Sequence, residues 1–352
     1  MPIERLPETV QTLYAELLDQ AIRAQAELSP LMPLHGSFVS KLIKGRVYWY
    51  LQRLEGDRKR QHYLGPESDS MLAAMADVEA QRKRAAPDAA RREQLVEMLV
   101  AGSAVRETAA VSKVLQVLGE TGMFRLGAVL VGTQAFSCLA NLLGVRFEHG
   151  SLRTEDVDIA QEPSLGVALV PDQAPADVLA ALRGAEPKFF AVPSLDPRQP
   201  STSFKVRGRD LRVDFLTPER GRSDRPVILP LFGVAATPLP MIGYLSESPI
   251  QAVVLGGSGV LLNVPRPGRF ALHKLWLADK RPLSERTKAR KDVRQATQLL
   301  EVLLEDRPEE IRAAWDALQR RPRDRSAVRK ALERAGSGEV LSRTLALVRP
   351  PG

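Results

Sequence analysis

The chain contains few of the residues that build disulfides, zinc sites and aromatic cores. Its 352 residues include a single cysteine, Cys138, four histidines and only 5% aromatic residues. One cysteine cannot form a disulfide within the chain, and the histidines show no spacing typical of a zinc site. We therefore expect a reducing compartment and a hydrophobic core built mainly from aliphatic side chains.

Long hydrophobic runs are also absent. No uninterrupted apolar stretch approaches the roughly 20 residues that a membrane-spanning helix needs. The first ten residues, MPIERLPETV, carry charges where a secretory signal has an apolar core. These observations predict a cytoplasmic protein without a membrane partner.

Positive charge is in excess. The formal net charge is +8 and the isoelectric point about 9.7, which favours polyanionic partners such as nucleic acids or nucleoside triphosphates. The alternative is compositional, because Arg-, Ala- and Pro-rich chains from GC-rich bacteria drift towards basic values. The length and the 44% hydrophobic content indicate a globular protein with two domains, or one large domain with appendages.

The first 120 residues have the pattern of an accessory module. Apolar residues at helical spacing predict a helix over 6–29, and alternating residues predict a small sheet over 36–65. Residues 70–120 have a helical pattern that we expect to break near Pro87. The predicted sheet interleaves cations with aromatic residues: Lys41, Lys44, Arg46, Arg53, Arg58, Lys59 and Arg60 with Tyr48, Trp49 and Tyr50.

That composition allows two interpretations. Aromatic rings beside cations stack on bases and contact phosphates, so the sheet is a candidate surface for RNA, such as tRNA, or DNA. Alternatively, it is a small structural sheet with solvated lysines. It weakly resembles the N-terminal sheets of phage-type integrases, but the C-terminal catalytic tyrosine of an integrase has no counterpart, because the last tyrosine is Tyr244.

The central segment alternates between strand and helix patterns. An apolar strand over 124–132 leads into a glycine turn and a helix over 133–143. A further strand follows over 154–160, and a helix over 171–182. Residues 204–215 then predict a hairpin that turns at a glycine.

Three aspartates lie on these predicted strands. Side chains at i and i+2 on a strand point the same way, so Asp156 and Asp158 share a face. Asp214, in an apolar run on the later hairpin, would complete a cluster that needs a counter-cation, and all-oxygen ligands favour Mg²⁺. A lone Asp-x-Asp is common on exposed strands. The glycine turn at Gly132 and the apolar neighbours of Asp214 favour a functional site.

Two predicted helices beyond residue 265 carry further candidates. Lys274 lies on a helix over 269–278, and Lys291 and Asp292 lie near the start of a helix over 288–304. Each has a structural alternative. Lys274 is an ordinary exposed lysine in that case, and Asp292 is a first-turn acid that interacts with the helix dipole.

The segments GTQAF, TEDVDI and RVDF resemble the nucleotidyltransferase superfamily. Its pattern is a Gly-Ser or Gly-Gly turn, an Asp-x-Asp pair and a distal Asp, and the likeness covers about residues 120–305. Thr133 stands where many members have Ser or Gly, and it keeps a hydroxyl. Lys274, Lys291 and Asp292 make the chain similar, more narrowly, to AbiEii-like toxins, which carry a comparable Lys and Lys-Asp on helices.

The resemblance implies an α/β fold. Residues 121–265 would form a nucleotidyltransferase-like mixed sheet with flanking helices. Residues 266–352 would form a helical C-terminal region that completes the nucleotide cleft. Residues 1–120, with helices and a small basic sheet, would be the N-terminal module.

The resemblance also implies residue roles. Asp156 and Asp158 would bridge the metal and the phosphates, and Asp214 would hold the metal of the nucleophile. Gly132 and Thr133 would approach the phosphates through the backbone of the following helix. The remaining implied residues are Lys274 and Lys291 as nucleotide ligands and Asp292 as a catalytic acid.

The implied activity is the Mg²⁺-dependent transfer of a nucleoside monophosphate from an NTP to a hydroxyl. The acceptor would be an RNA such as tRNA, a protein or a small molecule, in a toxin or phage-defence setting with a possible antitoxin partner. The competing interpretation is a non-catalytic nucleotide- or nucleic-acid-binding module with the same fold. The presence of all three aspartates favours the enzyme.

Overall fold

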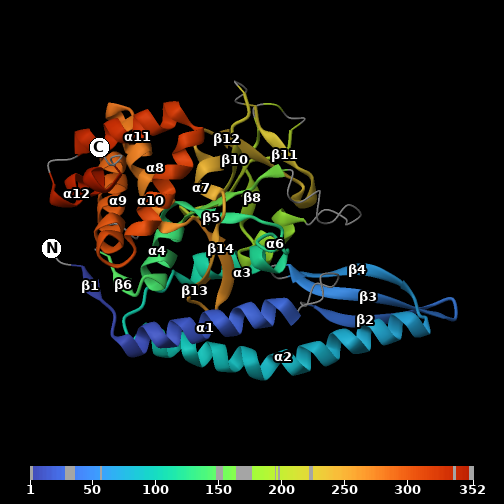
Figure 1. Cartoon of the computed structure of the whole chain (residues 1–352). Coiled ribbons are helices and arrows are strands. Elements are labelled where there is room, and N and C mark those ends of the chain that lie inside the picture. Colours follow the sequence, from blue (N-terminus) through green and yellow to red (C-terminus); the bar gives the residue numbers. More distant parts are fainter. Residues whose placement is uncertain are drawn as a thin grey trace.

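A mixed β-sheet forms the centre of the molecule (Figure 1). The computed structural model describes residues 3–27, 36–55, 58–147, 154–163, 177–194, 196, 199–221, 225–335 and 338–348. Within these residues the central sheet has nine strands in the order β11-β12-β10-β7-β5-β14-β13, with β9 beside β10 and β8 beside β9.

The strands of this sheet are short, and the sheet contains both parallel and antiparallel pairs. Parallel pairs join β7 to β10, β10 to β12 and β5 to β14, whereas β5 and β7 are antiparallel. The bounds are β5 (Val129–Val131), β7 (Asp156–Ala160), β8 (Phe189–Ala191), β9 (Ser203–Val206), β10 (Arg212–Pro218), β11 (Val227–Leu229), β12 (Val234–Leu239), β13 (Ile250–Val254) and β14 (Val260–Val264).

Helices cover the sheet and share one large aliphatic core with it. Helix α4 (Gly132–Leu142) follows β5 directly, and its apolar residues are almost all buried. The other helices that flank the sheet are α3 (Ala109–Glu120), α6 (Val178–Ala185), α7 (Ile242–Ser246), α8 (Pro267–Lys280) and α9 (Arg286–Asp306).

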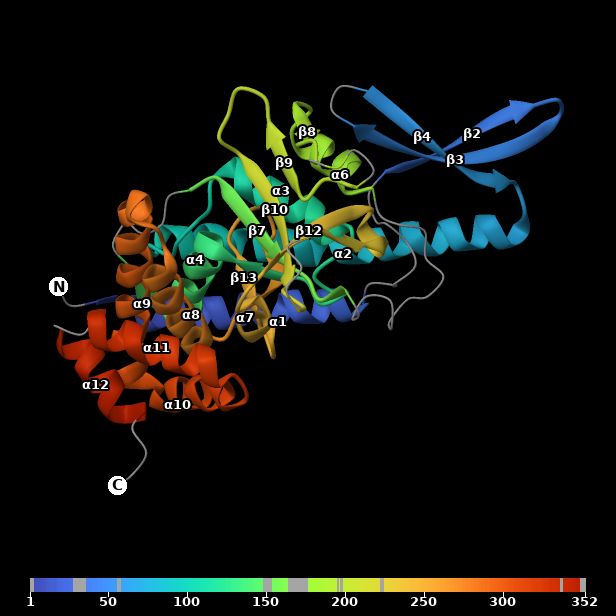
Figure 2. The ribbon, with the colours of Figure 1, turned by 90° about the horizontal axis from the view of Figure 1, so that it is seen from above.

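The C-terminal region is helical. Helices α10 (Pro308–Ala317), α11 (Pro322–Ala335) and α12 (Glu339–Val348) pack around α8 and α9, as Figure 2 shows. Helices α8 and α10 approach each other closely at Gly268, where an added Cβ would lie 2.8 Å from the backbone carbonyl carbon of Glu310. Short 3₁₀ turns connect neighbouring elements: η2 (Pro230–Phe232) lies between β11 and β12, η3 (Leu283–Glu285) between α8 and α9, and η4 (Leu318–Arg320) between α10 and α11.

The N-terminal helices are attached to the central sheet. Helix α1 (Glu8–Glu27) lies beside α2 (Asp69–Ala101), and strand β1 (Glu4–Arg5) pairs with β6 (Val145–Arg146). The buried Tyr14 hydroxyl donates to the Val253 carbonyl at 3.2 Å and accepts from the Val253 N–H at 3.0 Å. Helix α1 therefore shares a core with the edge of the sheet.

A second, three-stranded antiparallel sheet extends away from the main body over the far end of α2 (Figure 2). Its strands are β2 (Ser37–Ile43), β3 (Arg46–Glu55) and β4 (Arg58–Pro66). The predicted break at Pro87 is wrong, because α2 continues through this proline. Pro87 is exposed, and packing on both sides of it, at Val78 and at Val96, outweighs the lost hydrogen bond.

Most of the predicted elements are present, and the mixed α/β fold class is confirmed. Five strands were not predicted: β1, β6, β8, β11 and β12. The first part of the helix expected over 171–182 lies outside the described residues, and the remainder is α6. Within the described chain, no helix is long and apolar enough to cross a membrane. The domain boundaries near residues 120 and 265 stay a prediction.

Candidate active site

The three candidate aspartates lie on adjacent strands of the central sheet. Strands β7 and β10 run parallel, and their register places Asp214 directly opposite Asp158. Asp156 lies two residues before Asp158 and opposite Arg212. Because side chains alternate along a strand, all four residues project from the same face of the sheet.

The alternation on these strands is enforced by burial. Val157, Ile159, Val213 and Phe215 project from the opposite face and are each 0% exposed. A shift of one residue in either strand would place these side chains on the polar face and the carboxylates in the core. The apolar neighbours of the aspartates therefore fix the direction of the carboxylates.

Gly132 allows the helix that follows β5 to begin against the Asp158 carboxylate. Its φ of +69° is left-handed, and a Cβ at this position would overlap Asp158 Oδ2. Val131, the preceding residue, pairs with Asp158 across β5 and β7. Helix α4 lacks a side-chain cap, so its first turn directs backbone N–H groups from Gly132 and Thr133 towards this region.

Arg212 neutralises Asp214. Its Nε donates to Oδ1 of Asp214 at 2.8 Å, with Oδ2 at 2.6 Å, and also to the Ser203 hydroxyl at 3.0 Å. This contact was missed in the sequence, although an arginine two residues before the aspartate on one strand necessarily shares its face.

The carboxylate at the centre of the group holds its proton unusually well. The pKa of Asp158 is raised to about 6, first by burial and then by the charges of Asp214 and Asp156. Lys274 and Arg212 act in the opposite direction and lower it. Burial is thus the main cause of the shift, and the neighbouring carboxylates add to it.

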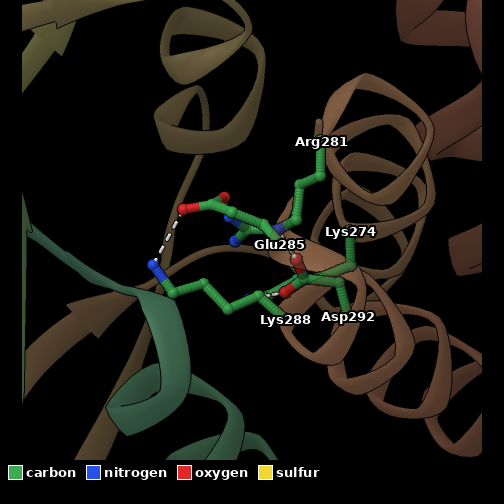
Figure 3. A network of polar contacts seen from close by, with 5 residues as sticks. All are labelled: Lys274, Arg281, Glu285, Lys288 and Asp292. Atoms are coloured by element: carbon green, nitrogen blue, oxygen red, sulfur yellow. Dashed lines mark hydrogen bonds and ion pairs between the residues drawn. The ribbon is translucent and has the colours of Figure 1, made fainter. Parts of the chain in front are cut away.

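Two helices bring positive charge to the edge of this site. Lys274 on α8 is 7% exposed, and its Nζ donates to Oδ1 of Asp292 on α9 at 2.8 Å (Figure 3). Asp292 is itself only 3% exposed and accepts a second hydrogen bond from Arg281 Nε at 2.6 Å. The alternative of an ordinary exposed lysine is therefore wrong for Lys274.

Asp292 belongs to a chain of ion pairs that runs from Lys274 to Lys288. Arg281 also pairs with Glu285 at 2.7 Å, and Glu285 with Lys288 at 3.0 Å (Figure 3). Because α9 begins at Arg286, Asp292 is beyond the first turn, and the alternative of a dipole-stabilised first-turn acid is wrong. Arg281, which contributes half of the contacts to Asp292, was not singled out in the sequence.

Lys291 completes the cationic edge. Its pKa is lowered by burial and by the charge of Lys274, while Asp292 and Asp156 counteract this shift. Lys291 on α9 is therefore within electrostatic range of Asp156 on β7. Lys274 acts on Asp158 in the same way. The structure thus places the two lysines within electrostatic range of Asp156 and Asp158, which precede them by more than 100 residues in the sequence.

A hollow of about 430 Å³ lies beside Asp156. Its wall contains three cations, Lys205, Arg209 and Arg212, and its other lining residues are Thr154, Glu155, Asp156 and Asp210. Gln134 on α4, which is completely buried, donates to the Thr154 carbonyl at 2.8 Å and thereby anchors the entry to β7. The volume suits a small polar ligand.

The donor set suits a hard divalent cation. Asp156, Asp158 and Asp214 offer only carboxylate oxygens, and the pKa of Asp158 is raised by burial and, to a smaller extent, by its two acidic neighbours. As the side chains stand in the described part of the chain, no three acidic, His or Cys side chains converge as a ready metal cage. Mg²⁺ does not require one, because it usually binds one or two carboxylates, waters and substrate phosphates.

Comparison with known proteins decides the family. A family model described as nucleotidyltransferase matches residues 109–319, more than half of the chain. The chain belongs to this nucleotidyltransferase family. The predicted superfamily, fold and enzyme class are thereby confirmed, and the matched range contains every candidate site residue. Searches of curated proteins and of solved structures found no match.

The raised pKa of Asp158 predicts a stability cost. The unfolded chain has an aspartate pKa of about 3.9, so the folded protein binds the proton more tightly, and its stability falls as the pH rises from about 4 to 6. Asp158→Asn, which stays neutral, should raise the free energy of unfolding at pH 7.5 by up to about 2 kcal/mol, and this gain should vanish near pH 4. Urea unfolding in EDTA measures it. Equal gains at both pH values, or the same gain from the exposed control Asp210→Asn, would contradict the prediction.

The Lys274–Asp292 pair predicts asymmetric effects of its two partners. Asp292→Ala leaves Lys274 buried without its partner and should lower the free energy of unfolding by about 3–5 kcal/mol. Lys274→Met should cost less, because Arg281 still pairs with Asp292. Adding Lys274→Met to Asp292→Ala should restore part of the loss, as a double-mutant cycle in urea measures. Strictly additive losses would show that the two groups are not coupled.

Proposed function

We propose that this nucleotidyltransferase moves a nucleoside monophosphate from an NTP to an acceptor hydroxyl at Asp156, Asp158 and Asp214. The observation that supports this most is the parallel register that sets Asp214 opposite Asp158, beside the left-handed Gly132. Three carboxylates on one polar face, with an apolar face behind them, have no structural purpose that would offset their repulsion.

In this proposal Asp156 and Asp158 face the triphosphate, and Asp214 faces the attacking hydroxyl. Magnesium bound by these carboxylates would neutralise phosphate oxygens and lower the pKa of the hydroxyl. Arg212 pairs with the Asp214 carboxylate and orients it. The acceptor oxygen attacks the α-phosphorus, and the bond to the β-phosphate oxygen breaks, so pyrophosphate leaves.

The phosphates have three sources of positive charge. The first turn of α4 offers N–H groups at Gly132 and Thr133. The wall of the hollow beside Asp156 offers guanidinium and ammonium groups, and Lys274 and Lys291 approach from the helical region. Each would stabilise charge on the leaving pyrophosphate.

Asp292 fits a positioning role. Its carboxylate is buried and saturated by Lys274 and Arg281, so it holds the lysine in place and has little capacity to act on substrate directly. A direct catalytic role for Asp292, expected from the AbiEii-like resemblance, stays a prediction. A toxin role with an antitoxin partner rests on the same resemblance. Growth arrest on expression that Asp214→Asn abolishes would support it.

The central test is label transfer from NTP. The full-length protein is incubated with each α-³²P-labelled NTP, Mg²⁺ and, separately, total RNA, total protein and a mixture of small metabolites. Asp214→Asn and Asp158→Asn should lower the transfer rate by at least about 100-fold, and EDTA should abolish it until Mg²⁺ is restored. Asp316→Asn, an exposed control on α10 outside the hollow, should retain the wild-type rate. Transfer that survives Asp214→Asn would refute the assigned site.

Gly132 offers a second test with a matched control. Gly132→Ala adds backbone strain and a Cβ that overlaps the Asp158 carboxylate, whereas Gly208→Ala adds similar strain at φ +79° with no atom within 4 Å. We expect Gly132→Ala to lower kcat/KM for transfer at least about 30-fold and Gly208→Ala to lower it less than about threefold. Equal losses would indicate that strain alone, and not access to the carboxylate, matters at Gly132.

A further inference from the structure

We propose that the outer face of the β2–β3–β4 sheet binds single-stranded RNA. The face in question, here called the tyrosine face, consists of Tyr48, Tyr50 and Tyr63 with Lys41, Arg46 and Lys59. This inference deepens the proposed function, on which it rests for one step: the bound RNA carries the acceptor hydroxyl.

The strand register assembles the three rings. Tyr50 pairs with Val39 on one side and with Tyr63 on the other, and Tyr48 pairs with Lys41. The Tyr50 and Tyr63 rings meet edge to face at 5.5 Å between centroids, and Tyr48 and Tyr63 are 6.2 Å apart. The Tyr63 side chain is 58% exposed, and the other two are partly exposed. The rings therefore form a continuous aromatic surface that water reaches.

The opposite face accounts for the structural needs of the sheet. There Leu51 is 7% exposed, the Arg82 guanidinium of α2 lies 5.5 Å from the Phe38 ring centroid, and Trp49 Nε1 donates to Glu67 at 3.0 Å. The sheet is thus held on α2 through that face. The tyrosines are not needed for this attachment, and three exposed aromatic rings are rare on a surface without a partner in a chain with 5% aromatic residues.

The charge of the tyrosine face has one sign. Lys41, Arg46 and Lys59 are exposed and, in the part of the chain that the structure describes, form no ion pair. The Lys41 ammonium lies over the Tyr50 ring, 4.7 Å from its centroid. Strand alternation places no acidic residue on this face among the described residues. Cations without counter-ions, interleaved with stacking rings, complement a phosphate chain with unpaired bases.

Single-stranded RNA fits better than the related polymers. A duplex keeps its bases stacked on each other and offers no base face to a tyrosine ring, whereas an unpaired strand does. Among single strands, RNA carries a 2′-hydroxyl at every nucleotide and so supplies the acceptor group that the proposed reaction consumes. Figure 2 shows the sheet extending beyond α6 at the side of the main body.

The test is direct RNA binding by the full-length protein. A fluorescein-labelled, 20-nucleotide RNA without secondary structure is titrated, and fluorescence anisotropy gives Kd at several salt concentrations. Tyr63→Ala should weaken binding about tenfold, and Tyr63→Phe, which keeps the ring, less than about twofold. Lys41→Ala and Lys59→Ala should each reduce the slope of log K against log salt by about 0.7. Lys330→Ala, an exposed lysine on α11, should change nothing.

The same titration separates the possible failures. The proposal is overturned if Tyr63→Ala and Lys41→Ala both bind RNA with wild-type affinity and have unchanged thermal midpoints. It is also overturned if DNA of the same sequence, or the RNA duplex, binds as tightly as the single-stranded RNA. Asp214→Asn should bind RNA normally, so a failure of the proposed chemistry leaves this readout intact. In label transfer, Tyr63→Ala should raise KM for RNA and leave KM for NTP unchanged.

Discussion

Electrostatic repulsion between Asp158 and Asp214 is the constraint on which the rest of the site depends. Parallel pairing of β7 and β10 holds the two residues in register, and the buried Val157 and Val213 prevent either strand from slipping. The carboxylates cannot separate without loss of the core on the other face. The resulting strain is visible in the pKa of Asp158, raised to about 6 by burial and by its acidic neighbours. The stability of the core thus keeps these carboxylates together, and the proposed Mg²⁺ would offset their charge.

The surrounding elements offset this charge without removing it. Arg212 pairs with Asp214 on the same strand, and the charge of Lys274 on α8 lowers the pKa of Asp158. Lys274 is in turn fixed by Asp292, and Arg281 fixes Asp292 from the other side. Buried ion pairs seldom add much stability, but they specify geometry, because a buried charge without its partner is costly. We infer that the helical region exists in part to position one lysine beside the acidic strands.

Local patterns in the sequence were sufficient to predict that the aspartates share a face, but insufficient to predict the ion pairs. The Asp-x-Asp spacing and the apolar neighbours of Asp214 predicted one shared face, because strand periodicity alone fixes direction. Which strand lies beside β7 depends on topology, and no local pattern specifies the contact of Arg281, just after α8, with Asp292 on α9, 11 residues later. Pro87 shows the converse error: a strong local signal for a helix break was overridden by packing along α2.

The arrangement of the two sheets bears on the kind of acceptor. Helix α2 has 33 residues and a length of about 50 Å at 1.5 Å per residue, and it carries the tyrosine face at the end remote from its contact with α1 and the central sheet. A small-molecule acceptor gains nothing from a surface on a separate sheet. A polymer does, because contacts along one segment raise the effective concentration of another segment at the site. The basic charge of the tyrosine face selects an anionic polymer, and the exposed rings select one with unpaired bases. Distance, charge and ring exposure are independent properties of the chain, and each favours an RNA acceptor over the alternatives.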